Sequence, residues 1–188
     1  MERRPKVLFD LDDTLFNTSK YIIDYLKHYY DYDINFEDIT VCNLEVTHPH
    51  IPIELVHEAV YSAITTTELE PFKNAVETVN YVAERNSTYI LSYRDLDLTY
   101  ITKDLLVRNG INIDKINVLH TKNKSNGIPD KAKFVAINDI DIVCEDNTNI
   151  IFDLYDRTIC SRIFIFDRPW NRFIEDNDRI VRIKSWEY

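Results

Sequence analysis

Three carboxylates, those of Asp10, Asp12 and Asp13, lie within four positions of one another directly after the apolar run 7–9. Like charges this close raise one another's pKa, so the arrangement is costly beside a hydrophobic strand. A chain tolerates the cost when a cation lies among the acids, or when their perturbed pKa values serve catalysis. The stretch therefore predicts an active site that handles phosphate.

Polar side chains further along the chain could complete such a site. They follow later apolar runs, or begin the helix before one: Ser92, Arg94, Lys131, Glu145 and Asp146. Phosphoryl transfer needs a nucleophile, a proton shuttle, a divalent cation and donors for the phosphate oxygens. Because the carboxyl ends of parallel strands meet at one edge of a sheet, we expect these residues to converge there. Arg94 fits a substrate contact or a surface ion pair equally well.

Short apolar runs predict the strands that position these groups: 6–10, 88–92, 116–120, 141–144, 162–166 and 179–183. Apolar residues at helical spacing predict the helices between them: one from Pro71 through 83, then 95–109, 131–137 and 148–155. Asp130 is the expected N-cap of the third of these helices. This alternation predicts an α/β fold with a doubly wound parallel sheet.

Residues 17–69 interrupt the alternation. Helices are expected from Thr18 to about residue 29 and over 53–64, with an irregular polar segment at 31–52. We therefore expect a core domain of residues 1–16 and 70–188, and a small helical cap of residues 17–69, called the helical insertion below. Its Tyr and Phe side chains could stack a nucleobase, enclose a small polar substrate, or form a core of their own. After the fifth strand, Arg168 and Trp170 could contact substrate or brace the metal-binding loop.

Composition narrows the choice of partners. The 188 residues carry a net charge of −10, which disfavours binding to a nucleic acid polymer. Two glycines are too few for a glycine-rich phosphate loop, and the three cysteines lack the spacing of a zinc site. No signal peptide or run of about 20 apolar residues is present, so we expect a cytoplasmic protein without a membrane partner. The sequence is compatible with a homo-oligomer and does not indicate the oligomeric state.

The charged residues also resemble the motifs of a known family. Residues 10–14, Asp-Leu-Asp-Asp-Thr, resemble motif I of the haloacid dehalogenase (HAD) superfamily, Asp-x-Asp-x-Thr/Val after a strand. Ser92 matches motif II, Lys131 motif III, and Glu145 with Asp146 the acidic motif IV. The resemblance covers nearly the whole chain. It implies a HAD-like, Rossmannoid core with a helical cap inserted after the first strand.

The resemblance implies a Mg²⁺-dependent phosphomonoester hydrolase that works through an aspartyl-phosphate. Asp10 would attack phosphorus, and Asp12 would protonate the leaving alcohol and then activate water. The metal ligands would be Asp10, Asp146 and Asp12, the last through its backbone carbonyl. Four residues would bind the small phosphorylated substrate, two of them (Ser92 and Lys131) also catalytic: Ser92, Tyr93, Arg94 and Lys131.

Three positions depart from the commonest pattern. Asp13 stands where glycine is frequent, and Asp tolerates unusual turn geometry better than most residues. Glu145 stands where Asp is usual, so we favour Asp146 as the ligand and Glu145 as a group behind it. Lys133 competes with Lys131 for motif III, and we favour Lys131 because it lies at the start of its helix.

Among HAD members the chain looks most like the 5′(3′)-deoxyribonucleotidase group, which implies (deoxy)nucleoside monophosphates as substrates. Phosphatases of other small metabolites, of the sugar-phosphate or phosphoserine type, are the first alternative. A polynucleotide 3′-phosphatase is disfavoured because no basic stretch occurs, and dehalogenase chemistry because it has no use for Asp12. A non-catalytic HAD-like binding module would be expected to lack the motif I acids or the motif III lysine, and this chain retains them.

Overall fold

The computed structural model describes residues 3–120 and 130–186. They form one sheet of six parallel strands in the order β3-β2-β1-β4-β5-β6. The strands are β1 Lys6–Phe9, β2 Ser87–Ser92, β3 Ile116–His120, β4 Ile142–Glu145, β5 Arg162–Phe166 and β6 Ile180–Ile183. The chain order reverses between β1 and β4, and the crevice beyond the carboxyl ends of two such strands is where ligands bind in open α/β sheets.

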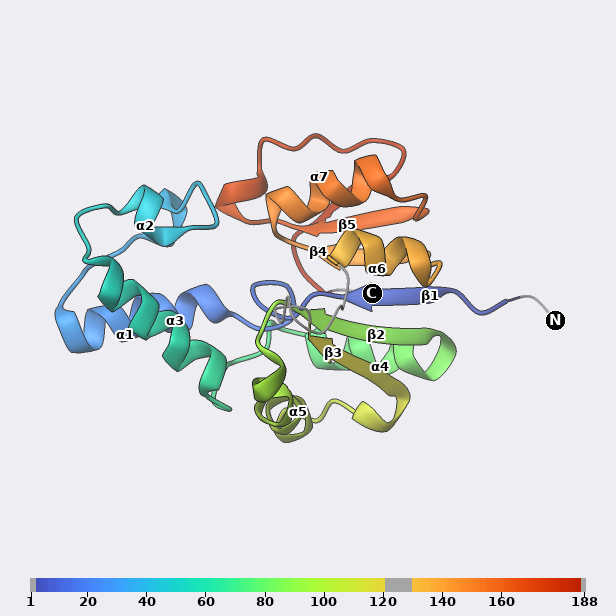
Figure 1. The fold of residues 1–188 in the computed structure, drawn as a ribbon, viewed down its shortest axis with the longest axis horizontal. Helices are drawn as coiled ribbons and strands as arrows, with labels where there is room; N and C mark the ends of the chain where they lie inside the picture. The colour runs from blue at the N-terminus through green and yellow to red at the C-terminus, as the bar shows by residue number, and fades with distance from the viewer. Residues whose placement is uncertain (1–2, 121–129, 187–188) are drawn as a thin grey trace.

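Helices cover both faces of the sheet (Figure 1). One face carries α4 (Ala75–Arg85) and α5 (Thr99–Arg108), and the other carries α6 (Lys131–Ile137) and α7 (Thr148–Arg157). Successive side chains of β1 point into opposite layers: Val7 and Phe9 belong to one buried cluster and Leu8 to the other. The predicted doubly wound α/β fold is confirmed.

Several predicted element bounds are wrong. The helix expected from Pro71 begins at Ala75, because residues 71–72 pair with the loop after β1: Pro71 forms a bridge with Phe16, and the Phe72 amide donates to the Leu15 carbonyl at 2.9 Å. The helix expected over 95–109 is divided into a 3₁₀ turn, Leu96–Leu98, and α5. The segment expected to be irregular contains a 3₁₀ turn, Phe36–Asp38, and a short helix, α2, Leu44–Thr47.

The helical insertion lies to one side of the sheet, at the left in Figure 1. Its two long helices, α1 (Thr18–Tyr30) and α3 (Ile53–Thr65), pack together around a hydrophobic cluster separate from the two core clusters. The chain leaves the core and returns to it at one place, since the Asn17 amide donates to the Glu70 carbonyl at 2.9 Å. Within the described residues, no helix is both long enough and apolar enough to span a bilayer.

Candidate active site

The loop after β1 turns back on itself so that several acids share a small space. The Asp10 amide donates to the Cys144 carbonyl at 2.9 Å, which extends the pairing of β1 with β4 by one residue. The amides of Leu15 and Phe16 both donate to the Leu11 carbonyl, closing the turn. Asp13 adopts the left-handed conformation, with φ of 57°, which Asp tolerates better than most residues. The tight turn leaves Asp10 at the end of the central strand and only 7% exposed.

Lys131 connects the acids of β1 and β4. Its ammonium donates to Asp10 Oδ1 at 2.6 Å and to Glu145 Oε2 at 2.7 Å, and all three side chains are buried. Although burial opposes it, the two carboxylates raise the pKa of Lys131, so the ammonium stays charged. Lys133, the competing candidate, is exposed on the same helix. The structure therefore places Lys131, and not Lys133, in the site.

Asp10 has a strongly perturbed environment. Burial raises its pKa to about 8, with further increases from the charges of Glu145 and Asp12, against the lowering effect of Lys131. Burial also raises the pKa of Asp146 well above its ordinary value, and the charges of Glu145 and Asp10 act in the same direction. One lysine thus faces more negative charge than it can balance, which favours a cation among these acids.

Asp12 is held by three neighbours. The Arg94 guanidinium donates to both carboxylate oxygens of Asp12, from Nη2 to Oδ1 at 2.6 Å and from Nε to Oδ2 at 3.1 Å. The hydroxyls of Thr18 and Ser92 donate to the same carboxylate at 2.7 and 3.3 Å. Although burial opposes it, the Arg94 charge and these hydrogen bonds lower the pKa of Asp12. Ser92 and Arg94, expected to bind substrate, both lie in the site but contact Asp12.

Tyr93, the remaining residue expected to bind substrate, is 46% exposed. Its ring centroid lies 5.7 Å from the Lys131 ammonium, within the range of a cation–π contact. The four residues expected to bind the substrate therefore all lie around the same acids.

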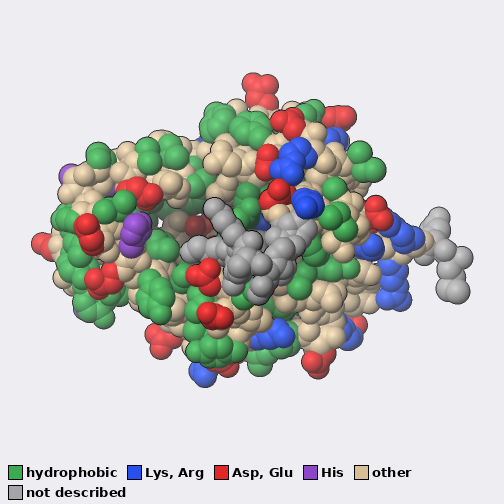
Figure 2. Space-filling model, viewed as in Figure 1, with side chains coloured by type: hydrophobic (Ala, Val, Ile, Leu, Met, Phe, Trp, Pro, Cys, Tyr) green, Lys and Arg blue, Asp and Glu red, His purple; other side chains and the backbone are tan. Residues whose placement is uncertain are grey.

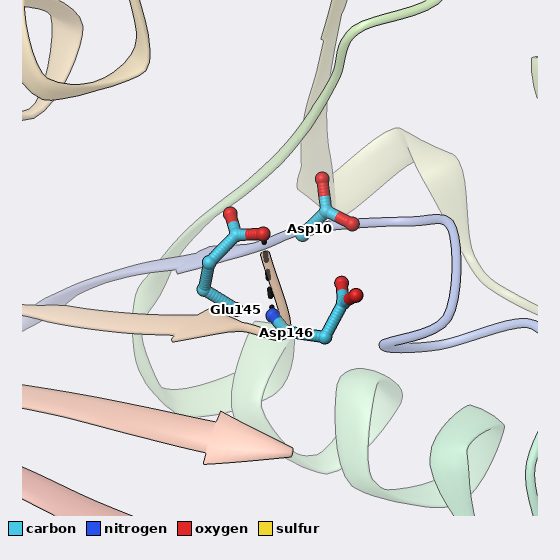
Figure 3. Close-up of side chains that lie close together, drawn as sticks. All are labelled: Asp10, Glu145 and Asp146. Atoms are coloured by element: carbon cyan, nitrogen blue, oxygen red, sulfur yellow. Dashed lines mark hydrogen bonds between the residues drawn. The ribbon is translucent and has the colours of Figure 1, made fainter. Parts of the chain in front are cut away.

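The residues best placed to hold a metal are Asp10, Glu145 and Asp146, whose ligand oxygens lie within 4.8 Å of one another (Figure 3). Carboxylate oxygens are the ligands that Mg²⁺ and Ca²⁺ prefer, so this donor set fits a hard divalent cation. The two Glu145 oxygens already accept hydrogen bonds, one from Lys131 and the other from the amides of Asp146 and Asn147. Those contacts favour Asp10 and Asp146 over Glu145 as direct ligands. The Asp12 carboxylate is not in the group, which leaves its backbone carbonyl for that role.

Two side chains hold the Asp146 carboxylate: Trp170, for which the sequence left a bracing role open, and Thr14, for which it indicated no role. Thr14 donates to Asp146 Oδ1 at 3.0 Å and the Trp170 indole to Oδ2 at 3.1 Å. Arg168 donates from Nε to the Asp13 carbonyl at 2.9 Å, with its guanidinium over the Phe72 ring. Of the two roles open for Arg168 and Trp170, these contacts favour bracing the metal-binding loop. The only sequence signal for Thr14 was its place in motif I. Thr18 begins its helix as expected, Asn17 is the N-cap, and the Thr18 hydroxyl binds Asp12, a contact that the sequence did not indicate.

A cavity of about 310 Å³ lies within the helical insertion. Apolar side chains form most of its wall, with Ser19, Cys42, Asn43, Glu45 and His57 as the other lining residues. Ser19, one of these lining residues, donates from its amide and its hydroxyl to the Asp13 carboxylate at 2.8 and 2.6 Å, so one wall of the cavity lies beside the loop after β1. On the face shown in Figure 2, the surface is hollowed between the helical insertion, at the left, and the rest of the molecule.

Comparison with known proteins identifies the architecture. No protein-family model matches the chain, and no curated protein matches it by sequence. Among solved structures, a haloacid dehalogenase-like hydrolase from Streptococcus pneumoniae is similar with a TM-score of 0.61 at 14% identity, over 87% of this chain and 85% of that one. The chain has the fold of HAD-like hydrolases. Its acids lie at the carboxyl ends of the two central strands, β1 and β4, between which the chain order reverses.

Two further structures with the HAD-like fold were solved with ligands. CbbY from Rhodobacter sphaeroides, in complex with phosphate, has a TM-score of 0.59 at 13% identity, over 97% of this chain and 95% of that one. A HAD hydrolase from Bacillus subtilis, bound to magnesium, has a TM-score of 0.59 at 10% identity, over 98% of this chain and 96% of that one. At these identities the likeness extends to the fold, and the chemistry must be argued from this chain's own residues.

Proposed function

We propose that this protein is a HAD-type, Mg²⁺-dependent phosphomonoesterase that forms an aspartyl-phosphate on Asp10. The observation that carries the proposal is the group at the ends of β1 and β4, where Lys131 donates to both Asp10 and Glu145, and the oxygens of Asp10, Glu145 and Asp146 lie within 4.8 Å of one another. Asp12, two residues further on, lies beside the same space and contacts Ser92 and Arg94. These are the nucleophile, cation site, proton shuttle and phosphate-binding donors that phosphoryl transfer needs.

In the first step a carboxylate oxygen of Asp10 attacks phosphorus, forming an acyl phosphate as the bond to the leaving alcohol breaks. Lys131 orients Asp10 by holding Oδ1, which leaves Oδ2 for the attack. Asp12 gives its proton to the alcohol, then takes a proton from the water that attacks the acyl phosphate and releases inorganic phosphate. Asp10, Asp146 and the Asp12 carbonyl would hold Mg²⁺, which when bound neutralises charge on the acids and phosphate oxygens.

Arg94 has a second part in this mechanism. It pairs with Asp12 and lowers the pKa of that carboxyl, whereas the first step needs Asp12 protonated. A phosphate dianion offers Arg94 another bidentate partner. We propose that Arg94 exchanges Asp12 for the substrate's phosphate oxygens, which frees Asp12 to bind a proton when substrate is present.

The preferred substrates we propose are (deoxy)nucleoside monophosphates. The cavity in the helical insertion, about 310 Å³, lies at the small end of the range of roughly 300–1,000 Å³ for ligand pockets and suits one small molecule. Its apolar wall with polar Asn43 and His57 fits a flat heterocycle that has hydrogen-bonding edges. The net charge of −10 disfavours a polynucleotide. The second candidate is a sugar phosphate, favoured by the HAD-like fold of a CbbY variant that was solved with xylulose-(1,5)bisphosphate.

An aryl phosphate assay, with Mg²⁺ and then with EDTA, tests the reaction class. We expect turnover only with the metal, and loss of about 10³-fold or more on Asp10→Asn, because the amide is not a nucleophile. Asp104→Asn is the matched control, since this exposed acid lies on α5 and, within the part of the chain that the structure describes, pairs only with Arg108. An inactive wild type, or a fully active Asp10→Asn, would overturn the proposed chemistry.

A panel of nucleoside monophosphates and sugar phosphates then tests the substrate class. We expect kcat/KM to be higher for the nucleotides, and to fall on His57→Ala for nucleotides more than for the aryl phosphate. Equal turnover across the panel would remove the nucleotide preference while leaving the phosphatase proposal intact.

A further inference from the structure

Trp170 belongs to the core, yet its ring lies in the interior of the helical insertion. It follows β5 in the 167–172 loop and is 3% exposed. It belongs to the same hydrophobic cluster as Leu26 and Val56 of the insertion. The Phe36 ring meets it edge to face, with centroids 5.8 Å apart and planes inclined at 73°. The insertion's hydrophobic cluster is therefore completed by a side chain from outside it.

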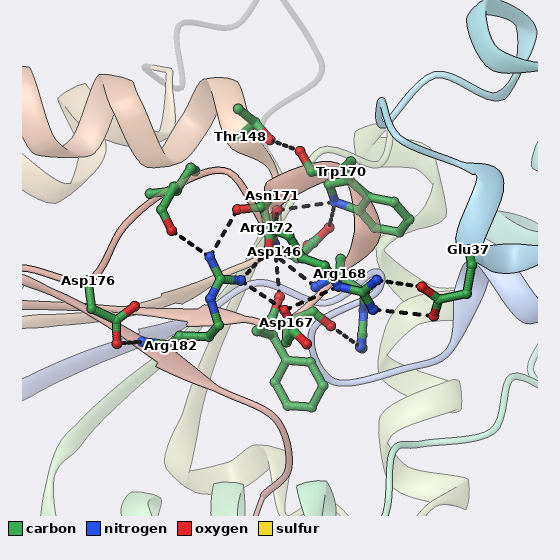
Figure 4. A network of polar contacts seen from close by, with 12 residues as sticks. Glu37, Asp146, Thr148, Asp167, Arg168, Trp170, Asn171, Arg172, Asp176 and Arg182 are labelled. Carbon is green, nitrogen blue, oxygen red and sulfur yellow. Dashed lines mark hydrogen bonds and ion pairs between the residues drawn. The ribbon is translucent and has the colours of Figure 1, made fainter.

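The polar edge of the same ring holds Asp146. The indole Nε1 donates to Asp146 Oδ2 at 3.1 Å and to the Asp146 carbonyl at 3.2 Å (Figure 4). Buried Trp N–H groups usually find a partner, and here the partner is a residue of the acidic cluster. A single side chain thus contacts both the interior of the helical insertion and a candidate metal ligand.

The loop that carries Trp170 is fastened to the core. Arg182 on β6 donates to Asp167 Oδ1 at 3.0 Å, and to Asn171 at its side-chain oxygen (2.8 Å) and its carbonyl (3.0 Å). Asn171, fully buried, donates to the Asp146 carbonyl at 2.9 Å. Because its backbone is held this way, Trp170 cannot follow the helical insertion if the insertion moves.

A second contact between the same loop and the helical insertion is weaker. Arg172 forms an ion pair with Glu37, but both side chains are about half exposed, at 47% and 54%. Exposed ion pairs contribute little to stability because water and salt screen them. Of these two contacts with the helical insertion, Trp170 is therefore the one through which a displacement of the insertion would reach Asp146.

We infer that Trp170 is a positioning residue that couples docking of the helical insertion to cation binding at Asp146. Displacing the insertion removes the packing that fixes the indole, and the indole then holds Asp146 less firmly. By thermodynamic linkage, a cation that fixes Asp146 must favour the docked insertion by the same factor. This inference rests on the proposed role of Asp146 as a Mg²⁺ ligand.

The direct test measures Mg²⁺ affinity by isothermal titration calorimetry in the full chain. Trp170→Phe keeps an aromatic ring in the cluster and deletes the N–H donor. Losing a group that orients a metal ligand typically weakens metal binding about 10–100-fold, and we expect about 10-fold here. Glu37→Gln is the matched control because it breaks only the exposed ion pair, and its Mg²⁺ affinity should stay within about twofold of wild type.

Phe36→Leu separates coupling from a purely local effect. Phe36 packs on the Trp170 ring and leaves the indole N–H in place. If packing in the insertion fixes Asp146 through Trp170, this variant weakens Mg²⁺ binding about 2–10-fold, the worth of one lost aromatic contact. In the reverse direction, Mg²⁺ should slow amide hydrogen exchange over residues 36–47 in the wild type, and have no such effect in Trp170→Phe.

The outcomes distinguish this inference from the proposed function. A wild type that does not bind Mg²⁺ overturns both the metal site and the coupling. Wild-type binding with unchanged affinity in Trp170→Phe overturns the coupling alone. Mg²⁺ binding that is weaker in Trp170→Phe but unchanged in Phe36→Leu also overturns the coupling, because the indole N–H would then act on Asp146 only locally. If Trp170→Phe does not fold, Phe36→Leu and the exchange experiment on the wild type decide.

Discussion

Replacing Lys131 by Met tests the charge balance on which the site depends. Met keeps most of the side-chain volume and removes the ammonium that lies 2.6 Å from Asp10 and 2.7 Å from Glu145. Removing one partner of a buried ion pair costs about 3–5 kcal/mol, because a charge is left buried without compensation. A chain of this length loses about 2–4 °C of melting temperature per kcal/mol. We therefore expect Lys131→Met to melt about 6–20 °C below wild type when metal is chelated.

The assay is thermal unfolding followed by circular dichroism in EDTA at pH 8 and at pH 5. The deficit should be smaller at pH 5, because Asp10, whose pKa is already raised to about 8, can then be protonated and no longer needs the ammonium. Lys133→Met is the matched control on the same helix, since Lys133 is exposed and its amide, which donates to Asp130, is kept in the variant. If the two variants melt within 2 °C of each other at pH 8, the reasoning from buried charge is wrong.

Three further results are expected. In EDTA the free energy of unfolding of the wild type should fall by on the order of 1 kcal/mol per pH unit between pH 5 and pH 8. The cause is that Asp10 and Asp146 have raised pKa values, so the folded state binds more protons than the unfolded state in this window. With saturating Mg²⁺ the melting temperature should depend less on pH. Arg94→Met should raise KM for substrate about 10-fold or more, with partial rescue by Arg94→Lys, and an unchanged KM would refute the proposed exchange of partners. Asp12→Asn should lower kcat about 10²–10⁴-fold while calorimetry shows Mg²⁺ affinity within about threefold of wild type, since only the backbone carbonyl is proposed as a ligand.

The sequence predicts the meeting of distant residues where one rule of topology is enough. Asp10, Lys131 and Asp146 are far apart in the chain, but parallel strands bring their carboxyl ends to one edge, and the structure places all three there. The choice of Lys131 over Lys133 rested on the place of Lys131 at the start of its helix. Residues two positions apart in a helix are separated by about 200° of rotation, so only one of the two lysines can face the acids, and in the structure Lys131 does so.

Contacts that depend on packing between separate units could not be predicted. No local pattern indicates that Trp170 reaches into the helical insertion or that its N–H meets Asp146. The pairing of Arg94 with Asp12 depends on the exact separation of two loops. The late start of α4 has the same cause: residues 71–72 have an apolar helical pattern, but their hydrogen bonds are made with the loop after β1.

The closeness of the two ends of the helical insertion has a consequence for protein engineering. Asn17 and Glu70 are hydrogen-bonded neighbours, so the insertion is a side branch that closes on itself before β2 begins. The entropy of closing such a branch grows only slowly with its length, so a graft at this junction tolerates replacements of very different size. A stricter requirement comes from Trp170. Any replacement must provide an apolar pocket for its indole, or the graft will expose a large aromatic side chain to water beside the acids.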